Sequence, residues 1–421
     1  MGEAMDDAQL LIAEMAAAAR GAARVLAAAS TAQKAAALHA AAAALREAMP
    51  AILDANAQDM AAGAARGLSA AMLDRLWLDE ARLEGVAAAL ENVARLDDPV
   101  GALIDSSTRP NGLVMERRRV PIGVIGIIYE SRPNVTADAA ALCVMSGNAV
   151  ILRGGSEAVH SNRAIHAALV TGIASAGLPA DAVQLVPTQE RAAVGAMLRA
   201  TGAIDIIIPR GGKSLVARVQ DEARVPVLAH LDGICHIYIH TAADPAMAEA
   251  IAVNAKMRRT GICGAAETLL VDQNYPAPAR LIAAMIDAGC EVRADAALME
   301  LDPRTVSAEP DDWGREYLDT IISAKMVRDV DDAIAHIAAY GSQHTESIVT
   351  QDQAAAEHFL IAVDSAIVMH NTSTQFADGG EFGLGAEIGI ATGRLHARGP
   401  VALEGLTTYK WLVRGHGQVR P

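Results

Sequence analysis

The chain has 421 residues, of which 52% are hydrophobic and 3% aromatic, so it can form two or three domains with aliphatic cores. Its formal net charge of −15 argues against nucleic acid or an anionic membrane as a main partner, because both are polyanions. Four cysteines without a CxxC pair give no disulfide framework and no zinc pattern, which fits a reducing cytoplasm.

Residues 3–100 are almost wholly helical in character, because the strong helix formers Ala, Leu, Met, Glu and Arg dominate them. A helical-repeat protein is the alternative, but no fixed period recurs. The first residues are acidic and no apolar run reaches membrane-spanning length, so we expect neither a signal peptide nor a transmembrane helix. We expect breaks between antiparallel helices at 30–31, near Pro50, at Gly63, at 67–69 and at 97–99.

After residue 100 the pattern changes to alternating strands and helices. A charged strand over 113–121 is predicted to be exposed, whereas the β-branched run 123–129 is of the kind buried on both faces of a parallel sheet. This alternation predicts a doubly wound α/β sheet. The further elements expected are strands at 149–152, 183–186, 204–208, 227–229 and 237–239, and helices at 136–145 and 157–176.

A second α/β unit is predicted to begin near Cys235. The chain ends in a Gly-rich tail and an extended strand over 406–413. Nothing follows that strand for it to pack on, which makes a partner subunit plausible. The elements expected in between are helices at 245–257, 277–288 and 330–340, and strands at 267–271, 321–326, 347–350 and 365–369.

Cys263 is the strongest candidate for chemistry. It lies in the segment TGICG, where small residues let a substrate approach the backbone closely. Positive charge on the preceding helix would favour the thiolate, which is the nucleophile. This setting indicates covalent catalysis, although a loop cysteine without a function fits about as well. The basic residues are Lys256, Arg258 and Arg259, and the cysteines in ordinary buried settings are Cys143, Cys235 and Cys290.

Two glycine clusters follow predicted strands and open helices, where backbone amides suit anionic ligands, although simple tight turns fit equally. The dinucleotide fingerprint GxGxxG is absent, and the GKS run lacks the first glycine of a phosphate-binding P-loop. His236 and His240 would lie about 13 Å apart on a strand, too far to share an ion, so we predict no metal site. The clusters are Arg153, Gly154, Gly155 and Ser156, and Arg210, Gly211, Gly212, Lys213 and Ser214.

The segment NAKMRRTGICGAAETLLV, residues 254–271, resembles the nucleophile segment of the gamma-glutamyl phosphate reductase family in the aldehyde dehydrogenase superfamily. Four further segments resemble the same family in chain order. No amino-acid kinase domain precedes them, so the chain resembles the monofunctional form. The four segments are 121–139, 147–157, 340–346 and 398–411.

The resemblance implies an aldehyde-dehydrogenase-like architecture in three parts. A cofactor-binding domain would comprise residues 1–102, 122–232 and 363–389, and a catalytic domain would comprise 233–362. A small β oligomerisation element would combine 103–121 with 390–421, which accounts for the charged strand and for the final strand. The implied partners are a second copy of the chain and glutamate 5-kinase, in the cytoplasm.

The resemblance also implies NADPH-dependent reduction of L-glutamyl 5-phosphate to L-glutamate 5-semialdehyde, the second step from glutamate to proline. Cys263 would form a thioester, with Asn134 and the Cys263 backbone N–H stabilising the oxyanion. Hydrolytic relatives carry a Glu general base where this chain has His230, so water activation is not expected, although His230 could act as a base. Glu316 is implied to hold the nicotinamide ribose, with a solvated loop carboxylate as the alternative.

The residues alone leave the choice of cofactor and the substrate contacts open. Arg153 would pair with the 2′-phosphate of NADPH, whereas Glu157 would hold the ribose of NADH, and the family implies NADP(H). The two glycine clusters complete the expected cofactor site. Basic side chains would bind the carboxylate and phosphate of the substrate, with surface placement as the alternative for each. The candidates are Arg132, Arg210, Lys213, Arg394 and His396.

Two alternative functions also fit the sequence. A hydrolytic or CoA-acylating aldehyde dehydrogenase belongs to the same superfamily, and a requirement for phosphate would separate it from a phosphate-releasing enzyme. A non-enzymatic helical scaffold or nucleotide-binding module is the rival from another class, and it would show no selective labelling of Cys263 by an electrophile.

Overall fold

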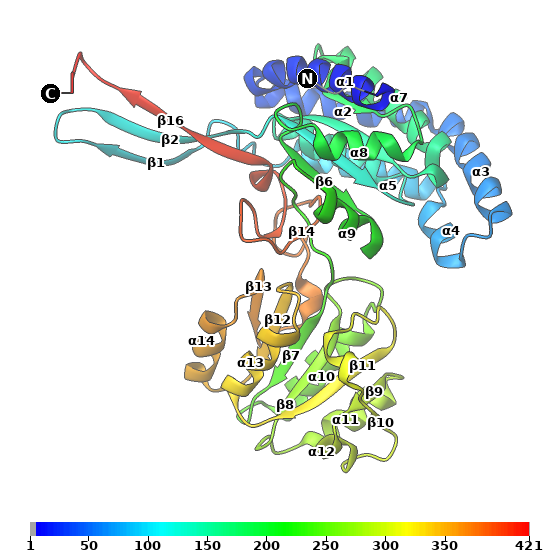
Figure 1. Cartoon of the computed structure of the whole chain (residues 1–421), viewed down its shortest axis with the longest axis vertical. Helices are drawn as coiled ribbons and strands as arrows, with labels where there is room; N and C mark the ends of the chain where they lie inside the picture. Colours follow the sequence, from blue (N-terminus) through cyan, green and yellow to red (C-terminus); the bar gives the residue numbers. More distant parts are fainter. Residues whose placement is uncertain (1–5, 421) are drawn as a thin grey trace. The chain divides into compact units, whose positions relative to one another are not determined.

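The computed structural model describes residues 6–420, which form two compact units (Figure 1). Unit 1 contains the described residues up to Ala229, residues 384–389 and the residues from Val401 onward. Unit 2 contains His230–Gly383 and Ile390–Pro400. The start of the acidic N-terminal segment, residues 1–5, lies outside the described residues. None of the described helices combines the length and the apolar character needed to cross a membrane.

Unit 1 opens with five helices, as predicted from the helix-forming composition. Four of them begin at an Asp or Ser whose side chain accepts a hydrogen bond from the backbone N–H three residues on. The break expected at Gly63 is wrong, because α3 continues to Ala65 and Gly63 only allows Leu68 to pack closely. The helices are α1 (Asp7–Ala28), α2 (Thr31–Glu47), α3 (Met49–Ala65), α4 (Ala70–Leu76) and α5 (Glu80–Ala94).

A four-stranded parallel sheet forms the centre of unit 1, with strand order β5-β4-β3-β6. Every residue of β3 is buried, as the β-branched run predicted. The strand expected at 227–229 is wrong, because only Val227 forms an isolated bridge. The elements are β3 (Val124–Tyr129), β4 (Ala149–Gly154), β5 (Val183–Leu185), β6 (Ile206–Arg210), α6 (Val135–Met145), α7 (Val159–Ser175), α8 (Arg191–Arg199) and α9 (Lys213–Glu222).

The strand order reverses next to β3. The chain places β4 and β5 on one side of β3 and then returns to place β6 on the other side. In open α/β sheets, ligands bind at the carboxyl ends of the strands where the order reverses. Both predicted glycine clusters lie at such carboxyl ends, one after β4 and one after β6.

A separate antiparallel sheet belongs to unit 1 and forms the long arm seen in Figure 1. The final strand is not left without a neighbour, because it pairs with β2 from Thr407 opposite Pro121 to Arg414 opposite Val114. The outer edge of β16 has no neighbour among the described residues. The strands are β1 (Leu103–Thr108), β2 (Val114–Pro121) and β16 (Thr407–Arg414).

Unit 2 contains a seven-stranded parallel sheet in the order β10-β9-β11-β8-β7-β12-β13. Alternate residues of β8 face opposite sides, so Leu269 packs with α10, α11 and α12, whereas Leu270 packs with α13 and α14. The elements are β7 (Cys235–Ile239), α10 (Pro245–Met257), β8 (Ala266–Asp272), α11 (Pro278–Asp287), β9 (Glu291–Ala294), α12 (Ala296–Met299), β10 (Val306–Ser307), β11 (Ile321–Val327), α13 (Val330–Tyr340), β12 (Thr345–Val349), α14 (Gln353–Ala362) and β13 (Ile367–His370).

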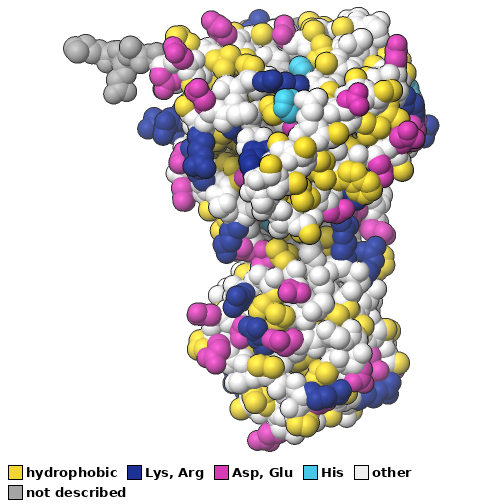
Figure 2. All heavy atoms as spheres, turned by 90° about the vertical axis from the view of Figure 1, so that its right-hand side faces the viewer, with side chains coloured by type: hydrophobic (Ala, Val, Ile, Leu, Met, Phe, Trp, Pro, Cys, Tyr) yellow, Lys and Arg dark blue, Asp and Glu magenta, His cyan; other side chains and the backbone are white. Residues whose placement is uncertain are grey.

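Acidic and basic side chains are interspersed on the face that Figure 2 shows, rather than gathered into one basic surface.

Short segments complete the description of the fold. The remaining elements are β14 (Ile390–Ala391) and β15 (Gly399–Pro400), and the 3-10 helices η1 (Ser156–Ala158), η2 (Ala180–Ala182), η3 (Pro310–Gly314), η4 (Thr374–Phe376) and η5 (Glu404–Leu406).

Candidate active site

Cys263 lies in the turn between α10 and β8 and is partly exposed. The Sγ atom of Cys235 donates to the Cys263 carbonyl oxygen at 3.1 Å. A Cβ atom added to Gly233 would lie 2.2 Å from the same oxygen, so the backbone of residue 233 packs directly on this turn. Gly264 is also confined, because an added Cβ would lie 3.1 Å from the Thr374 carbonyl oxygen. The backbone that carries the Cys263 thiol is therefore held by close packing.

The other three cysteines are buried, as their sequence settings predicted. Burial raises the pKa of the Cys290 thiol to about 12 and raises that of Cys143 further. Burial, reinforced by the charge of Glu346, also raises the pKa of Cys235. These thiols are protonated near neutral pH, so Cys263 is the cysteine placed to act as a nucleophile.

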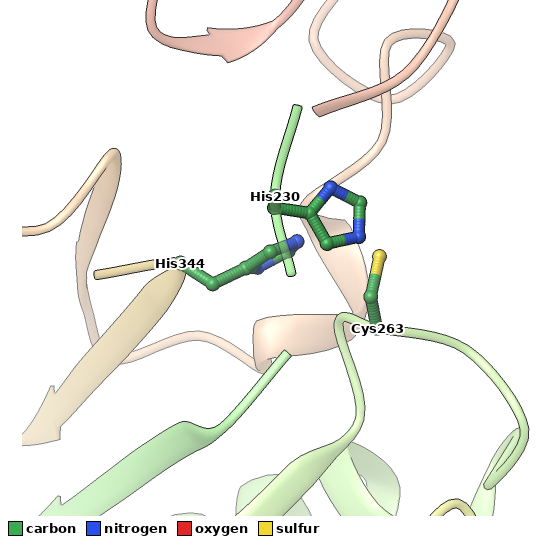
Figure 3. Close-up of side chains that lie close together, drawn as sticks. All are labelled: His230, Cys263 and His344. Atoms are coloured by element: carbon green, nitrogen blue, oxygen red, sulfur yellow. The ribbon is translucent and has the colours of Figure 1, made fainter. Parts of the chain in front are cut away.

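His230 and His344 converge on Cys263 (Figure 3). One ligand-type atom from each of the three side chains lies within 4.8 Å of the others. The imidazole rings meet edge to face, with centroids 5.0 Å apart. The Nδ1 atom of His230 lies 2.7 Å from the carbonyl oxygen of Ile390. A carbonyl oxygen only accepts, so Nδ1 carries a proton, and Nε2 has a lone pair when the ring is neutral.

His344 is buried at the start of β12. Its Nδ1 atom lies 2.9 Å from Thr345 Oγ1 and 3.6 Å from Cys235 Sγ. Burial, assisted by the nearby His230, lowers the pKa of His344 to about 3, so its ring is neutral at pH 7. The sequence analysis assigned His344 no role, although it lies in the family-like segment 340–346. A histidine just before a buried strand does not by itself indicate contact with Cys263.

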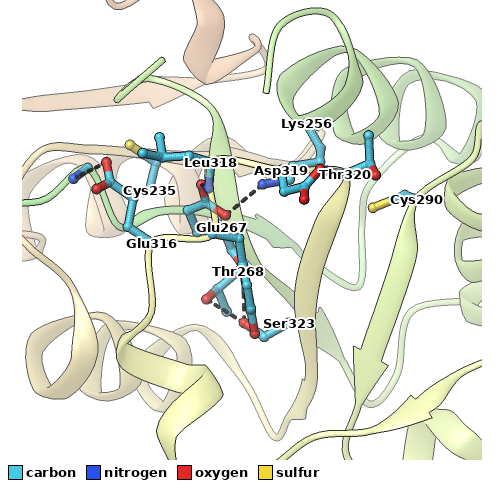
Figure 4. Close-up of polar contacts among 12 residues, drawn as sticks. Cys235, Lys256, Glu267, Thr268, Cys290, Glu316, Leu318, Asp319, Thr320 and Ser323 are labelled. Carbon is cyan, nitrogen blue, oxygen red and sulfur yellow. Dashed lines mark hydrogen bonds and ion pairs between the residues drawn. The ribbon is translucent and has the colours of Figure 1, made fainter. Parts of the chain in front are cut away.

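Lys256 does not direct its charge at Cys263, which corrects the expectation from the sequence. It is fully buried, and its Nζ atom lies 2.6 Å from Glu267 Oε2 on β8. Burial raises the pKa of Glu267 to about 7, an effect that the lysine opposes. Glu267 also accepts from the N–H of Leu318 at 3.2 Å (Figure 4). The ion pair therefore joins α10 to β8, and the hydrogen bond from Leu318 joins both to the 316–318 loop. The helix α10 leads directly to the turn that carries Cys263.

Glu316 is tied to the backbone beside the nucleophile. Its Oε1 atom accepts from the Gly233 N–H at 2.9 Å (Figure 4). This contact argues against a merely solvated loop carboxylate. A role for Glu316 at the nicotinamide ribose stays a prediction.

Asn134 precedes α6 in unit 1, whereas Cys263 belongs to unit 2. The Nδ2 atom of Asn134 donates to Asp138 Oδ2 at 2.8 Å. Burial raises the pKa of Asp138 to about 6, opposed by this hydrogen bond. One amide hydrogen of Asn134 is used in the contact, which leaves the second for another acceptor. The pairing of Asn134 with Cys263 around an oxyanion stays a prediction.

Arg153, at the end of β4, is held by main-chain oxygens. Its Nη atoms donate to Gly154 at 3.0 Å and to Gln189 at 2.9 Å, while its buried Nε has no partner among residues 6–420. Burial lowers the pKa of Arg153. Glu157, the alternative ribose ligand, accepts from the Ser131 hydroxyl at 2.9 Å. The arginine therefore retains a donor for a ligand, and the glutamate is already engaged.

The second glycine cluster opens α9. Gly212 precedes the helix, and its N–H donates to Glu130 Oε2 at 3.1 Å. A Cβ on Gly211 would lie 2.5 Å from the same oxygen, so the carboxylate packs against the turn. Lys213 and Ser214 begin the helix itself. The turn is a helix N-terminus with a lysine, although a carboxylate already occupies one of its amides.

The basic candidates are divided between the two units. Arg132, Arg210 and Lys213 belong to unit 1, and Arg394 and His396 belong to unit 2. Arg394 is exposed and pairs with Asp364. His396 is also exposed, with a φ of 69°.

Comparison with known proteins places these features in context. A family model described as the aldehyde dehydrogenase family matches residues 2–298. Gamma-glutamyl phosphate reductase of Sphingopyxis alaskensis is 72% identical over 99% of this chain and 97% of that protein. The protein of the same name from Rhizorhabdus wittichii is 69% identical over 100% of this chain and 98% of that one. The crystal structure of gamma-glutamyl phosphate reductase from Thermotoga maritima matches with a TM-score of 0.95 and 43% identity, covering 97% of this chain and 100% of that one.

Proposed function

The chain belongs to the aldehyde dehydrogenase family and, within it, to the gamma-glutamyl phosphate reductases, as the sequence resemblance predicted together with the fold class. On that premise we propose that it reduces L-glutamyl 5-phosphate to L-glutamate 5-semialdehyde and releases phosphate. This is the second step from glutamate to proline, and we place it in the cytoplasm. One observation carries the proposal. Cys263 is partly exposed on a closely packed, glycine-flanked turn, whereas the other three cysteines are buried.

The thiolate of Cys263 attacks the acyl carbon, and the carbonyl oxygen becomes an oxyanion. The backbone N–H of Cys263 and the second amide hydrogen of Asn134 stabilise that charge. The oxyanion collapses, the C–O bond to phosphate breaks, and a thioester remains on the sulfur. When bound, NADPH supplies the hydride that reduces this thioester. Collapse of the resulting hemithioacetal returns the Cys263 thiolate and releases the aldehyde.

The family resemblance matches His230 to the position where hydrolytic relatives carry a glutamate base. Its Nδ1–H is committed to the Ile390 carbonyl, so only Nε2 could receive a proton. A strong base here would activate water and destroy the thioester. The absence of a carboxylate favours phosphate as the leaving group in reduction and as the attacking group in the reverse reaction.

The residues at the reversal of the strand order fit a dinucleotide. Arg153 retains a buried, unpartnered Nε among the described residues, which suits an acidic group such as a 2′-phosphate. The start of α9 offers backbone amides and Lys213. Gly154, Gly155 and Ser156 form the turn after Arg153, and Glu316 is the proposed ribose ligand in unit 2. We therefore assign NADP(H) as the cofactor.

The remaining assignments concern partners. We infer a homo-oligomer that uses the arm of β1, β2 and β16, the main part of the proposed element 103–121 and 390–421. Glutamate 5-kinase would deliver the unstable acyl phosphate. Arg132, Arg210, Arg394 and His396 are the proposed contacts for the carboxylate and phosphate of the substrate.

The test is an assay of NADP reduction with glutamate semialdehyde, with and without inorganic phosphate. We expect activity only with phosphate, loss of turnover in Cys263→Ala, and full activity in the control Cys290→Ala. Phosphate-independent oxidation would instead identify a hydrolytic dehydrogenase, and a requirement for CoA would identify an acylating one. Normal turnover by Cys263→Ala would end the covalent mechanism.

A further inference from the structure

The side chains around the nucleophile form a second kind of site besides a reaction centre. His230, Cys263 and His344 bring two imidazoles and one thiol together, with ligand-type atoms within 4.8 Å of one another (Figure 3). Imidazole nitrogen and thiolate sulfur are the donors that Zn²⁺ and similar borderline ions prefer in proteins. All three residues belong to unit 2, so the group does not depend on how the two units are placed.

The Nδ1 atom of each imidazole makes a hydrogen bond, as the second ring nitrogen does in metal sites. The Nδ1–H of His230 donates to the Ile390 carbonyl oxygen at 2.7 Å, which turns its Nε2 lone pair toward the group. The Nδ1 atom of His344 lies 2.9 Å from Thr345 Oγ1. Metal-binding histidines usually use their second ring nitrogen in this way, because the contact fixes the tautomer and the ring orientation.

His344 supplies an independent indication of a missing ligand. Its side chain is fully buried, yet its Nε2 atom has no hydrogen-bond partner among residues 6–420. A buried polar atom without a partner is costly, and such atoms occur where a ligand or ion completes the site. Figure 3 shows the ring of His344 pointing toward His230, and the sulfur of Cys263 beside the His230 ring.

The spacing is close to that of a bound ion. Tetrahedral Zn²⁺ with bonds of about 2.0–2.3 Å separates its ligand atoms by about 3.3–3.6 Å. The observed limit of 4.8 Å therefore requires the three side chains to close by roughly an ångström. Cys263 lies on a partly exposed turn, so solvent can reach the fourth coordination position.

We propose that His230, Cys263 and His344 bind one divalent zinc-like cation. The ion binds the sulfur of Cys263 and reversibly prevents it from reacting with substrate. The ion replaces the thiol proton of Cys263, and water takes the fourth position. Binding requires only these side chains, whereas the inhibition that follows rests on the proposed catalytic role of Cys263. The site departs from the sequence-based prediction of no metal, because its ligands lie far apart along the chain.

The first test titrates the untagged chain with Co²⁺, whose bond to a thiolate gives a charge-transfer absorption. We expect one ion per chain, displacement by Zn²⁺ and no such absorption in Cys263→Ser. Affinity should fall by about ten-fold or more in His344→Gln and in the more accessible variant His230→Gln. The control His370→Gln removes a histidine that also contacts a backbone carbonyl, and it should bind within about two-fold of the unmodified chain.

The second test follows alkylation of Cys263 by iodoacetamide, read by mass spectrometry. Zn²⁺ should slow the labelling, and a chelator should restore it. The proposal is overturned if the unmodified chain gives no thiolate absorption, if both histidine variants bind as tightly as it does, or if Zn²⁺ leaves the labelling rate unchanged. Binding at Cys263 in a chain that lacks reductase activity would uphold the metal site and reject only the proposed function.

Discussion

Arg153 is the single residue on which the proposed preference for NADPH depends. Each of its two Nη atoms donates one N–H to a main-chain oxygen, and its buried Nε has no partner among the described residues. We expect Arg153→Ala to raise the KM for NADPH by about ten-fold or more, the effect of losing one charge-assisted hydrogen bond, with little change for NADH. Steady-state kinetics with both cofactors tests this. Arg163→Ala, which removes another arginine contact to a main-chain oxygen, that of Pro187, is the control. Equal effects on the two cofactors would exclude a contact with the 2′-phosphate.

Asp138 is a positioning residue for Asn134. It holds the amide at 2.8 Å, so its loss frees the proposed oxyanion donor to rotate. We expect Asp138→Ala to lower kcat by about ten-fold, less than the 10²–10³-fold expected for Asn134→Ala. The isosteric variant Asp138→Asn keeps an acceptor and should restore most of the rate. Failure of this rescue, with circular dichroism unchanged, would argue against the positioning role.

The sequence pointed to Cys263 as the candidate nucleophile but not to its surroundings. Cys263 could be found because its signal is local, a cysteine among glycines after a basic helix. His344 could not, because it reaches Cys263 only through the pairing of β12 with β7 in the folded sheet. The charge of Lys256 was misjudged for the same reason, since its partner Glu267 became a neighbour only when β8 was buried beside α10.

At the scale of the element, the nucleophile turn depends on a glycine outside it. A Cβ at position 233 would meet the Cys263 carbonyl oxygen at 2.2 Å, and backbone atoms cannot yield as a flexible side chain can. We expect Gly233→Ala to cost about 1–3 kcal/mol of stability and to lower kcat strongly, because it displaces the turn. Thermal unfolding and kinetics test both effects. Gly314→Ala, where an added Cβ meets nothing within 4 Å, is the matched control.

The buried ion pair joins α10 to β8. Removing the lysine leaves the Glu267 carboxylate buried without a partner charge. We therefore expect Lys256→Met to lower the free energy of unfolding by about 3–5 kcal/mol near pH 8. Breaking the exposed pair of Arg328 and Asp332 with Arg328→Met should cost far less, because water already solvates that charge. Urea denaturation gives both values. Equal losses in the two variants would show that the pair is not held as the structure describes.

The loss in free energy of unfolding caused by Lys256→Met should depend on pH. Burial raises the pKa of Glu267 from 4.5 to about 7, and loss of the lysine that opposes this effect raises it further. A carboxyl group whose folded-state pKa is raised favours folding below its unfolded pKa, and this contribution is lost as the pH rises through the folded pKa. The deficit of Lys256→Met should therefore be smaller at pH 5 than at pH 8. A deficit that does not change between these pH values would contradict the assignment.

Element boundaries were most predictable where a local pattern coincided with burial. The helices 245–257 and 330–340 were predicted to the residue, because Pro245 and the run of aspartates before Ala333 mark their starts. Short elements such as α12 and β10 were missed, since a few residues show no period. The strand expected at 227–229 failed because a short apolar run cannot reveal whether it finds a neighbour.

At the scale of the whole molecule, composition and periodicity predicted the α/β class, but not which strands lie side by side. The order β10-β9-β11-β8-β7-β12-β13 brings together strands that are distant in the chain. The order follows from packing the helices on both faces, which no single window of sequence contains. The final strand illustrates this best, because it seemed to lack a partner until β2 was found beside it.

The arm carries exposed apolar side chains in regular register along its last strand. Tyr409, Trp411 and Val413 alternate along β16 on one face and are 49%, 52% and 52% exposed. The guanidinium of Arg117 on β2 lies over both aromatic rings, which keeps this face ordered. A row of this kind on an edge strand fits a contact with a second copy of the chain.

Charges placed in that row should therefore dissociate the proposed oligomer. We expect the double variant Trp411→Glu and Val413→Glu to elute as a smaller species in size-exclusion chromatography with light scattering, because two carboxylates would have to be buried in the contact. Ile361→Glu, which alters an 82% exposed apolar residue on α14, should leave the mass unchanged. If the arm variant keeps the mass of the unmodified chain, the contact between copies lies elsewhere. If it dissociates yet keeps its thermal stability, the arm serves assembly rather than the folding of unit 1.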